Sequence, residues 1–374
     1  MMAVFCAMII PVLAQTIDPS PRRMEYVKGG ERVYGFVKAD GTVVTKPVYA
    51  YAHEFSEGLA VVLDSRGRWG CVDTTGKRIF SFPSTLSHDP SMFVVGNFSE
   101  GLCWFRDSIT EKVGFVDKKG AVVVKPQWDF AHDFQCGLAA VGRGRIWMSN
   151  FFEWFGLTGY IDHSGKVVVD LNLGNGQYDE NIDFSDNMAV ITKGNHVMII
   201  DTKGNNVALK EYRQAMHFSE GLCAVAVATN EPCEGHDCEL RWGFIDANGQ
   251  MVIKPTYRYG GMFREGLCAI MVGKSYVFID RAGRNVMGRQ FENARPFYEG
   301  LAYVEEKDGT VGYINHKGEM VLRLKDGFHG MDFKCGLVEV GKGEKRGKYT
   351  DWTERLIDRK GKVVWEYEYT SWFD

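Results

Sequence analysis

The sequence lacks the features of helical, membrane-spanning and nucleic-acid-binding proteins. Helical periodicity is not sustained anywhere in its 374 residues, so an all-β chain is expected. Beyond residue 15 no apolar stretch reaches the ~20 residues that span a bilayer, so no membrane span is expected in the mature chain. The 44 Lys and Arg residues balance 48 Asp and Glu residues with no long run of either sign, so nucleic acid is not an expected partner.

Motifs of common enzyme classes are also missing. The chain contains no Gly-x-Ser-x-Gly elbow and no His-Glu-x-x-His pair. Gly273-Lys274-Ser275 imitates the end of a phosphate-binding loop, but Cys268 stands where that loop requires Gly. We therefore predict a non-enzymatic protein, with no catalytic residue, cofactor or metal site.

The N-terminus, in contrast, carries a clear apolar segment. Residues 1–15 contain no Lys, Arg, Asp or Glu, and an apolar run over residues 3–13 precedes Ala14. This pattern predicts a signal peptide over residues 1–14. A polar, proline-containing linker over residues 15–23 and one repeat domain over residues 24–374 are expected to follow. The protein is then exported, to the periplasm, the extracellular space or the cell surface.

One phrase recurs nine times along the chain: two mainly apolar or aromatic residues, then usually Asp with two polar residues, then Gly. Residues 115–120 and 244–249 are clear copies, and the closing glycines lie 34 to 45 residues apart. Such a period is typical of one small supersecondary unit repeated in tandem. Asp at the first and Gly at the fourth position favour a type I turn with a bulge, so each phrase predicts a β-hairpin.

A second phrase, Phe-x-Glu-Gly-Leu, alternates with the first. Its clear copies begin at Phe55, Phe98, Phe218, Phe263 and Phe297. Between the phrases, β-branched segments end in Lys-Pro at Pro47, Pro126 and Pro255, and proline cannot donate to a strand ladder. A third strand is expected after each Glu-Gly-Leu. The chain is therefore predicted to contain about nine three-stranded antiparallel units.

The order of these units allows two architectures. Residues 24–28 resemble a third strand, whereas the chain stops after a second strand at residues 363–367. A curved open array, or solenoid, would use both half-units as caps. A closed propeller-like ring would instead join the two ends, but nine blades of three strands exceed the usual four to eight blades of four. The open array is the main prediction and the ring the alternative.

Together these phrases resemble the bacterial WG-containing repeat, also called the KWG repeat. Trp69-Gly70 and Trp242-Gly243 carry the Trp-Gly pair, while Tyr34-Gly35 and Val113-Gly114 depart from it. The resemblance covers residues 24–367. It implies a bacterial repeat scaffold, frequently exported, with no assigned catalytic residues. More distantly, aromatic-glycine β repeats resemble cell-wall-binding repeats that hold choline or glucan.

Chemically reactive side chains mostly recur at fixed repeat positions. The glutamates of the second phrase, the aspartates of the first and the histidines His53, His132 and His217 all do so. A side chain that recurs in every unit is expected to stabilise a turn rather than to act in catalysis. We therefore predict a turn role for both sets of carboxylates. Five cysteines also recur and are expected to be small apolar residues in half-buried strands or turns.

Departures from the repeat supply the candidate binding residues. An insertion between residues 139 and 159 contains five aromatic residues: Trp147, Phe151, Phe152, Trp154 and Phe155. Aromatic side chains on a loop stack on sugars or anchor a protein partner, although a loop that folds back would bury them. A second aromatic cluster, residues 365–373, ends the chain as a cap or a docking edge.

Cys233 and Cys238 lie in a stretch that the other units lack. In an oxidising compartment they predict a local disulfide. The alternative is a metal site that adds His236, but four close ligands are usual and only three suitable ones are present.

These patterns favour a β-repeat scaffold that mediates protein–protein interaction. The alternative is binding of carbohydrate or cell-envelope glycan through the aromatic residues. Exposed parallel rings would favour the glycan, and a flat apolar patch would favour the protein partner.

Overall fold

The computed structural model describes residues 17–28, 31–83, 94–147, 153–171, 173, 182–193, 196–229, 240–325 and 327–372. Within these ranges the chain forms 30 β-strands and no helix. No helix in the described part of the chain is therefore long and apolar enough to cross a membrane.

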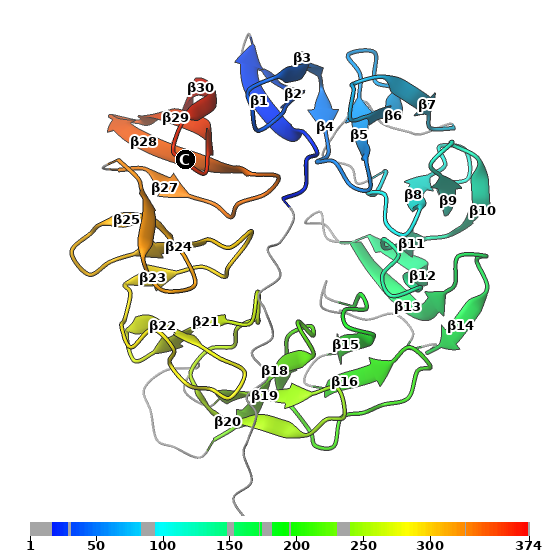
Figure 1. Ribbon diagram of the computed structural model, residues 1–374. Coiled ribbons are helices and arrows are strands. Elements are labelled where there is room, and N and C mark those ends of the chain that lie inside the picture. Colours follow the sequence, from blue (N-terminus) through cyan, green and yellow to red (C-terminus); the bar gives the residue numbers. More distant parts are fainter. Residues whose placement is uncertain are drawn as a thin grey trace, which may run out of the picture.

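The described strands form nine small antiparallel sheets arranged around a ring (Figure 1). The first five sheets contain β1 (Arg22–Lys28), β2 (Glu31–Val37) and β3 (Val43–Tyr49); β4 (Tyr51–Ala52), β5 (Leu59–Leu63), β6 (Trp69–Asp73) and β7 (Arg78–Ser81); β8 (Leu102–Arg106), β9 (Val113–Asp117) and β10 (Val122–Trp128); β11 (Phe130–Ala131), β12 (Ala139–Trp147), β13 (Glu153–Ile161) and β14 (Val167–Asp170); and β15 (Met188–Lys193) and β16 (His196–Asp201).

The remaining four sheets complete the ring. They contain β17 (Gln214–Ala215), β18 (Leu222–Ala228), β19 (Leu240–Asp246) and β20 (Met251–Tyr257); β21 (Cys268–Val272) and β22 (Ser275–Ile279); β23 (Asn293–Ala294), β24 (Ala302–Glu305), β25 (Val311–Ile314) and β26 (Met320–Arg323); and β27 (His329–Gly330), β28 (Leu337–Arg346), β29 (Tyr349–Asp358) and β30 (Val363–Trp372). β1 begins inside the segment expected as a linker.

A complete sheet has four strands in chain order, as β4 to β7 show. The short β4 lies at one edge, β5 follows the Glu-Gly turn, β6 carries Trp69-Gly70, and β7 follows the Asp turn. Outer strands such as β7, β10 and β14 lie at the rim of the ring, which places the short strands at its inner side (Figure 1). The prediction of three-stranded units missed these two-residue inner strands. The strand after each Glu-Gly turn also belongs to the sheet of the Asp hairpin that follows it in the chain.

Aromatic residues hold neighbouring sheets together. The Phe of each Phe-x-Glu-Gly-Leu phrase is almost completely buried, and in most units it meets an aromatic residue of the preceding Asp hairpin. Phe115 and Phe134 lie 4.9 Å apart between ring centroids, and Phe244 and Phe263 lie 5.1 Å apart, both in edge-on geometry. Such pairs are worth ~0.5–1.5 kcal/mol beyond their buried area. The core is therefore a series of similar clusters between sheets.

The ring closes between the first sheet and the last (Figure 1). Met24 and Val37 of the first sheet share a buried cluster with Leu337 and Leu356 of the last. Trp365 Nε1 donates a hydrogen bond of 2.9 Å to the Glu25 carbonyl oxygen. The expected open array is therefore wrong, and the ring alternative describes the architecture.

Closure does not use a shared strand, however. β1 pairs with β2 inside its own sheet, from Arg22 opposite Val37 to Lys28 opposite Glu31. The last sheet is complete without it, because β27, β28, β29 and β30 are consecutive in the chain. Side-chain packing, together with the Trp365 hydrogen bond, thus joins the two ends.

Candidate functional site: two unlike faces of the ring

The ring has two faces that differ in their connections. Antiparallel strands reverse direction at each turn, so the Glu-Gly turns and the Asp-x-x-Gly turns of every sheet lie on the same side. We call this side the turn face. The connections between the strands equivalent to β5 and β6, and the crossovers between sheets, lie on the opposite side, the loop face. Each face carries a different part of the repeat chemistry.

Aspartates on the turn face cap their own turns, as predicted. Asp73 Oδ1 accepts hydrogen bonds of 2.9 Å from Thr75 N and 3.1 Å from Lys77 N, while Gly76 adopts a φ of +82°. The same two backbone bonds recur at Asp117, Asp162, Asp201, Asp246, Asp280 and Asp358. Hydrogen bonds, first from the Thr75 side chain, lower the pKa of Asp73. These carboxylates are therefore occupied within the turns.

Glutamates of the second phrase do more than form turns, which corrects the prediction for this set. The Glu57 carboxylate accepts hydrogen bonds from Glu100 N at 2.7 Å and Gly101 N at 2.9 Å, both in the next sheet. Glu100, Glu220, Glu265 and Glu299 accept equivalent bonds from Gly137, Gly266, Gly300 and Gly336. Each glutamate therefore links its sheet to the following one.

A basic residue from the Asp turn of the following sheet approaches each of these glutamates. Lys118 Nζ lies 3.1 Å from Glu57 Oε2, and His163 Nε2 lies 3.0 Å from Glu100 Oε2. His316 Nε2 lies 3.1 Å from Glu265 Oε2, while Arg281 and Arg359 donate hydrogen bonds to the backbone carbonyl oxygens of Glu220 and Glu299. Where Cys335 replaces the glutamate, Ala39 replaces the base. This pairing of positions within one chain is a signal that the sequence analysis missed.

Two of the recurring histidines make a second set of contacts between sheets, on the inner side of the ring. His53 Nδ1 lies 2.8 Å from Asn97 Oδ1, and His132 Nδ1 lies 2.9 Å from Asp183 Oδ1. Asp133 accepts a hydrogen bond from Asn97 N, and burial raises its pKa to about 6. These contacts all involve the two residues before the buried Phe, so they too serve the joints between sheets.

The loop face carries the departures from the repeat. Trp147, Trp154 and Phe155 lie in the extended hairpin of β12 and β13, where Trp147 pairs with Glu153 and Ile146 with Trp154. The other two predicted aromatic residues, Phe151 and Phe152, lie outside the described residues. The hairpin brings three of the five residues together along the backbone, and their role in binding stays a prediction.

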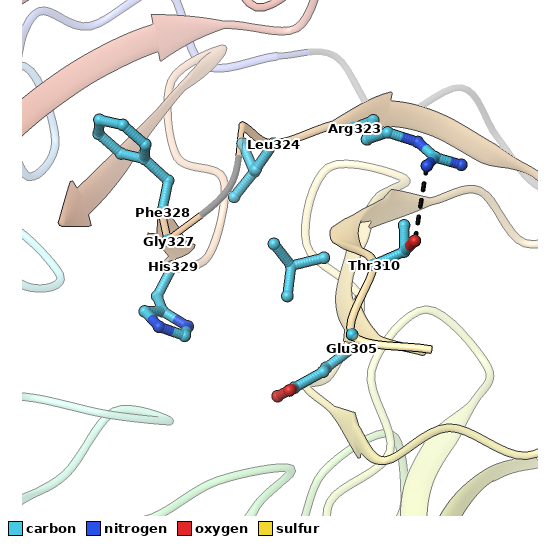
Figure 2. A pocket seen from close by; sticks show the side chains of 9 residues that line it. Glu305, Thr310, Arg323, Leu324, Gly327, Phe328 and His329 are labelled. Carbon is cyan, nitrogen blue, oxygen red and sulfur yellow. Dashed lines mark hydrogen bonds between the residues drawn. The ribbon is translucent and has the colours of Figure 1, made fainter. Parts of the chain in front are cut away.

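A pocket of about 340 Å³ also opens on the loop face, between the eighth and ninth sheets (Figure 2). It is lined by Glu305, Gly309, Thr310, Val311, Arg323, Leu324, Gly327, Phe328 and His329. Arg323 Nη1 donates to Thr310 Oγ1 at 3.5 Å, and His329 Nδ1 lies 3.3 Å from the Tyr303 hydroxyl. The pocket pairs a carboxylate and a guanidinium with a buried apolar floor, at the small end of the range for ligand pockets. No sequence motif indicated it.

Cysteines in the described strands are buried, as expected. Burial raises the pKa of the Cys71, Cys223 and Cys268 thiols to about 12, so these thiols are unreactive near neutral pH. Cys233, His236 and Cys238 lie outside the described residues, and their disulfide stays a prediction. No cluster of three metal-ligating side chains occurs in the part of the chain that the structure describes.

Comparison with solved structures returns proteins of low similarity. BamB from Moraxella catarrhalis is 9% identical over 91% of this chain and 92% of its own, with a TM-score of 0.33. Hsv2 from Kluyveromyces lactis is 11% identical over 84% and 94%, with a TM-score of 0.35. The WD40 beta propeller domain of Doa1 is 10% identical over 81% and 95%, with a TM-score of 0.29. Likeness at this level bears on neither partner nor activity.

The comparison with protein families is specific. No curated protein matches the chain. The family described as "WG containing repeat" matches residues 34–64, 114–144, 198–227, 242–276 and 278–310. These matches are spread around the ring and contain the Glu-Gly and Asp turns described above. The chain therefore contains WG-containing repeats.

Proposed function

We propose that this protein is a non-enzymatic scaffold that binds a protein partner through its loop face. The observation that carries the proposal is the contrast between the two faces. On the turn face, repeated carboxylates are occupied by backbone amides and basic side chains. On the loop face, β12 and β13 extend to nine residues each and β28 and β29 to ten, against five in β5 and β6.

Export is part of the same proposal. The uncharged apolar residues 1–14 support a signal peptide, and the periplasm, the extracellular space or the cell surface would oxidise Cys233 and Cys238 to a disulfide. Export also suits the aromatic hairpin, because the hairpin would meet envelope or secreted proteins in these compartments.

A glycan is the second candidate ligand, and one observation favours it. Trp352 and Tyr369 stack with ring centroids 6.3 Å apart and an interplanar angle of 14°, and Tyr367 continues the ladder. Parallel rings suit the flat faces of sugars. Arg32 covers Tyr369 at 5.3 Å, however, and Tyr367 is buried, so the protein partner remains the leading proposal.

The test compares two variants of the chain from Gln15 onward, each with five substitutions. The loop-face variant changes Trp147, Phe151, Phe152, Trp154 and Phe155 to Ser. The control changes five exposed valines of the outer rim to Ser: Val43, Val122, Val168, Val252 and Val321. Both variants and the parent are used in cell-envelope pull-downs and on a glycan array, after thermal unfolding has shown that they fold.

Loss of a captured protein in the loop-face variant alone supports the scaffold. Loss of glycan binding in that variant places a glycan site on the hairpin instead. Equal capture by both variants and the parent would contradict a docking role for the hairpin.

A further inference from the structure

The outer edges of most of the described sheets are protected against pairing with other strands. β3, β10 and β20 each contain a proline and a register shift, and β7, β14 and β26 span only four residues. Short length, bulges and proline are the usual protections of a sheet edge, because a free edge otherwise recruits another strand.

β30 has none of these protections over most of its length. It runs for ten residues from Val363 to Trp372 without proline. It pairs with β29 in continuous register from Tyr349 opposite Trp372 to Leu356 opposite Trp365, and the single shift lies at its start. The sheet order ends at β30, so its second edge faces away from its own sheet. This is the longest outer edge in the described part of the ring.

Side chains along this edge give it a chemical preference. Glu366 and Glu368 are exposed on one face of β30, while Trp365 and Tyr369 are half-buried on the other. Arg355 pairs with Glu366, whereas Thr353 lies opposite Glu368. The exposed row is therefore acidic, and opposite charges on neighbouring strands stabilise a sheet.

A second copy of the chain fits this edge poorly. In an antiparallel pair, opposed residues lie on the same face of the sheet. The two registers with the greatest overlap of β30 with its copy place Glu366 against Glu368, or Glu368 against itself. Like charges in direct opposition destabilise a strand pair.

We propose that the free edge of β30 binds an extended segment of a protein partner by strand addition, and that this segment carries Lys or Arg at alternate positions. The backbone of the segment continues the hydrogen-bonded ladder of the last sheet. Its basic side chains lie over Glu366 and Glu368, and its intervening apolar residues lie beside Trp365 and Tyr369. This site lies apart from the β12–β13 hairpin, so it does not depend on the function proposed above.

The test uses a fluorescent peptide of about ten residues, the length of β30, in which Lys and Val alternate. Fluorescence anisotropy measures its binding to the full chain. Glu368→Lys is expected to weaken binding by about fivefold or more, because a favourable cross-strand pair becomes a repulsive one. Glu292→Lys makes the same charge change at an exposed residue of the eighth sheet and is expected to leave binding unchanged.

Two further measurements separate strand addition from simple charge attraction. Hydrogen exchange over residues 363–372 is expected to slow when the peptide binds. The same peptide with every backbone amide N-methylated keeps its charge but cannot join a ladder, and it is expected not to bind.

Three outcomes would overturn the proposal. They are equal binding of the N-methylated peptide, equal weakening by Glu292→Lys, and protection of residues 363–372 that rises with protein concentration in the absence of peptide. The last would assign the edge to a second copy of the chain.

Discussion

The glutamate of each Glu-Gly turn shows how one residue can join two sheets. Glu57 adopts a φ of +51°, a conformation that costs free energy for a residue with a Cβ atom. In this position its carboxylate reaches two backbone amides and Lys118 in the next sheet. The joint, rather than the turn, explains why a glutamate is found there.

Removal of this carboxylate is expected to destabilise the ring. Glu57→Ala leaves Glu100 N and Gly101 N without their acceptor and removes the ion pair with Lys118, and it should lower the free energy of unfolding by about 1–3 kcal/mol. Urea unfolding measures the change. Glu368→Ala, which removes an exposed carboxylate from β30, is the control and should change stability by less than about 0.5 kcal/mol. Equal effects of the two substitutions would show that the joint contributes nothing.

Acidic residues at the closure of the ring predict a pH dependence. Burial, together with nearby Glu339 and Glu25, raises the pKa of Glu354 from 4.5 to about 7, against the opposing charge of Arg32. The folded state therefore holds this proton more tightly than the unfolded chain does. The contribution of Glu354 to stability is largest below pH 4.5 and is lost as the pH rises towards 7.

Glu354→Gln is accordingly expected to weaken the fall in the free energy of unfolding between pH 5 and pH 8. Other carboxyls with a raised pKa, such as Glu339 and Asp133, would keep part of it. Unfolding curves at several pH values provide the measurement, with Glu368→Gln as the control. An identical pH dependence in Glu354→Gln and the parent would remove Glu354 from the explanation.

At the scale of the element, the sequence predicted the β-hairpins but not the further strands and sheets that they contact. Asp-x-x-Gly between apolar segments correctly predicted turns such as the one at Asp73, because one residue and its neighbours determine them. The inner strand Tyr51–Ala52 is too short to show any periodicity. The loop-face pocket likewise depends on residues of two sheets, from Glu305 to His329.

Contacts between sheets could have been found only by comparing repeat positions within the chain. Glu57 and Lys118 are 61 residues apart, and neither phrase alone relates them. Elsewhere in the ring, Cys335 and Ala39 occupy the two equivalent positions, and this joint replacement is the pattern that relates the glutamate to the lysine.

The aromatic joint between sheets gives a prediction for the element. Phe134 is completely buried and packs on Phe115, so Phe134→Ala is expected to lower the free energy of unfolding by about 3–5 kcal/mol. Tyr26→Ala, at a side chain that is 45% exposed, should have little effect. Thermal or denaturant unfolding distinguishes them, and a small loss for Phe134→Ala would mean that the joint is loosely packed.

For the whole molecule, the strands predicted at the two ends of the sequence left open whether the units form an open array or a closed ring. The structure closes the ring through the Trp365–Glu25 hydrogen bond and the buried cluster that contains Met24 and Leu356. Residues more than 300 positions apart meet there, which no local pattern indicates. Closure fixes the two unlike faces that the proposed function requires.

The most direct test of closure is a pair of distances measured by spin-label spectroscopy. Val43 and Val363 each lie two residues after the Gly of an Asp turn, in the first and last sheets, and Val122 and Val167 do so in the third and fourth. Labels introduced as non-natural amino acids leave the native thiols unchanged. A closed ring predicts the same narrow distance for both pairs. A longer, broad distribution for residues 43 and 363 alone would show that the ring is open and would contradict this account.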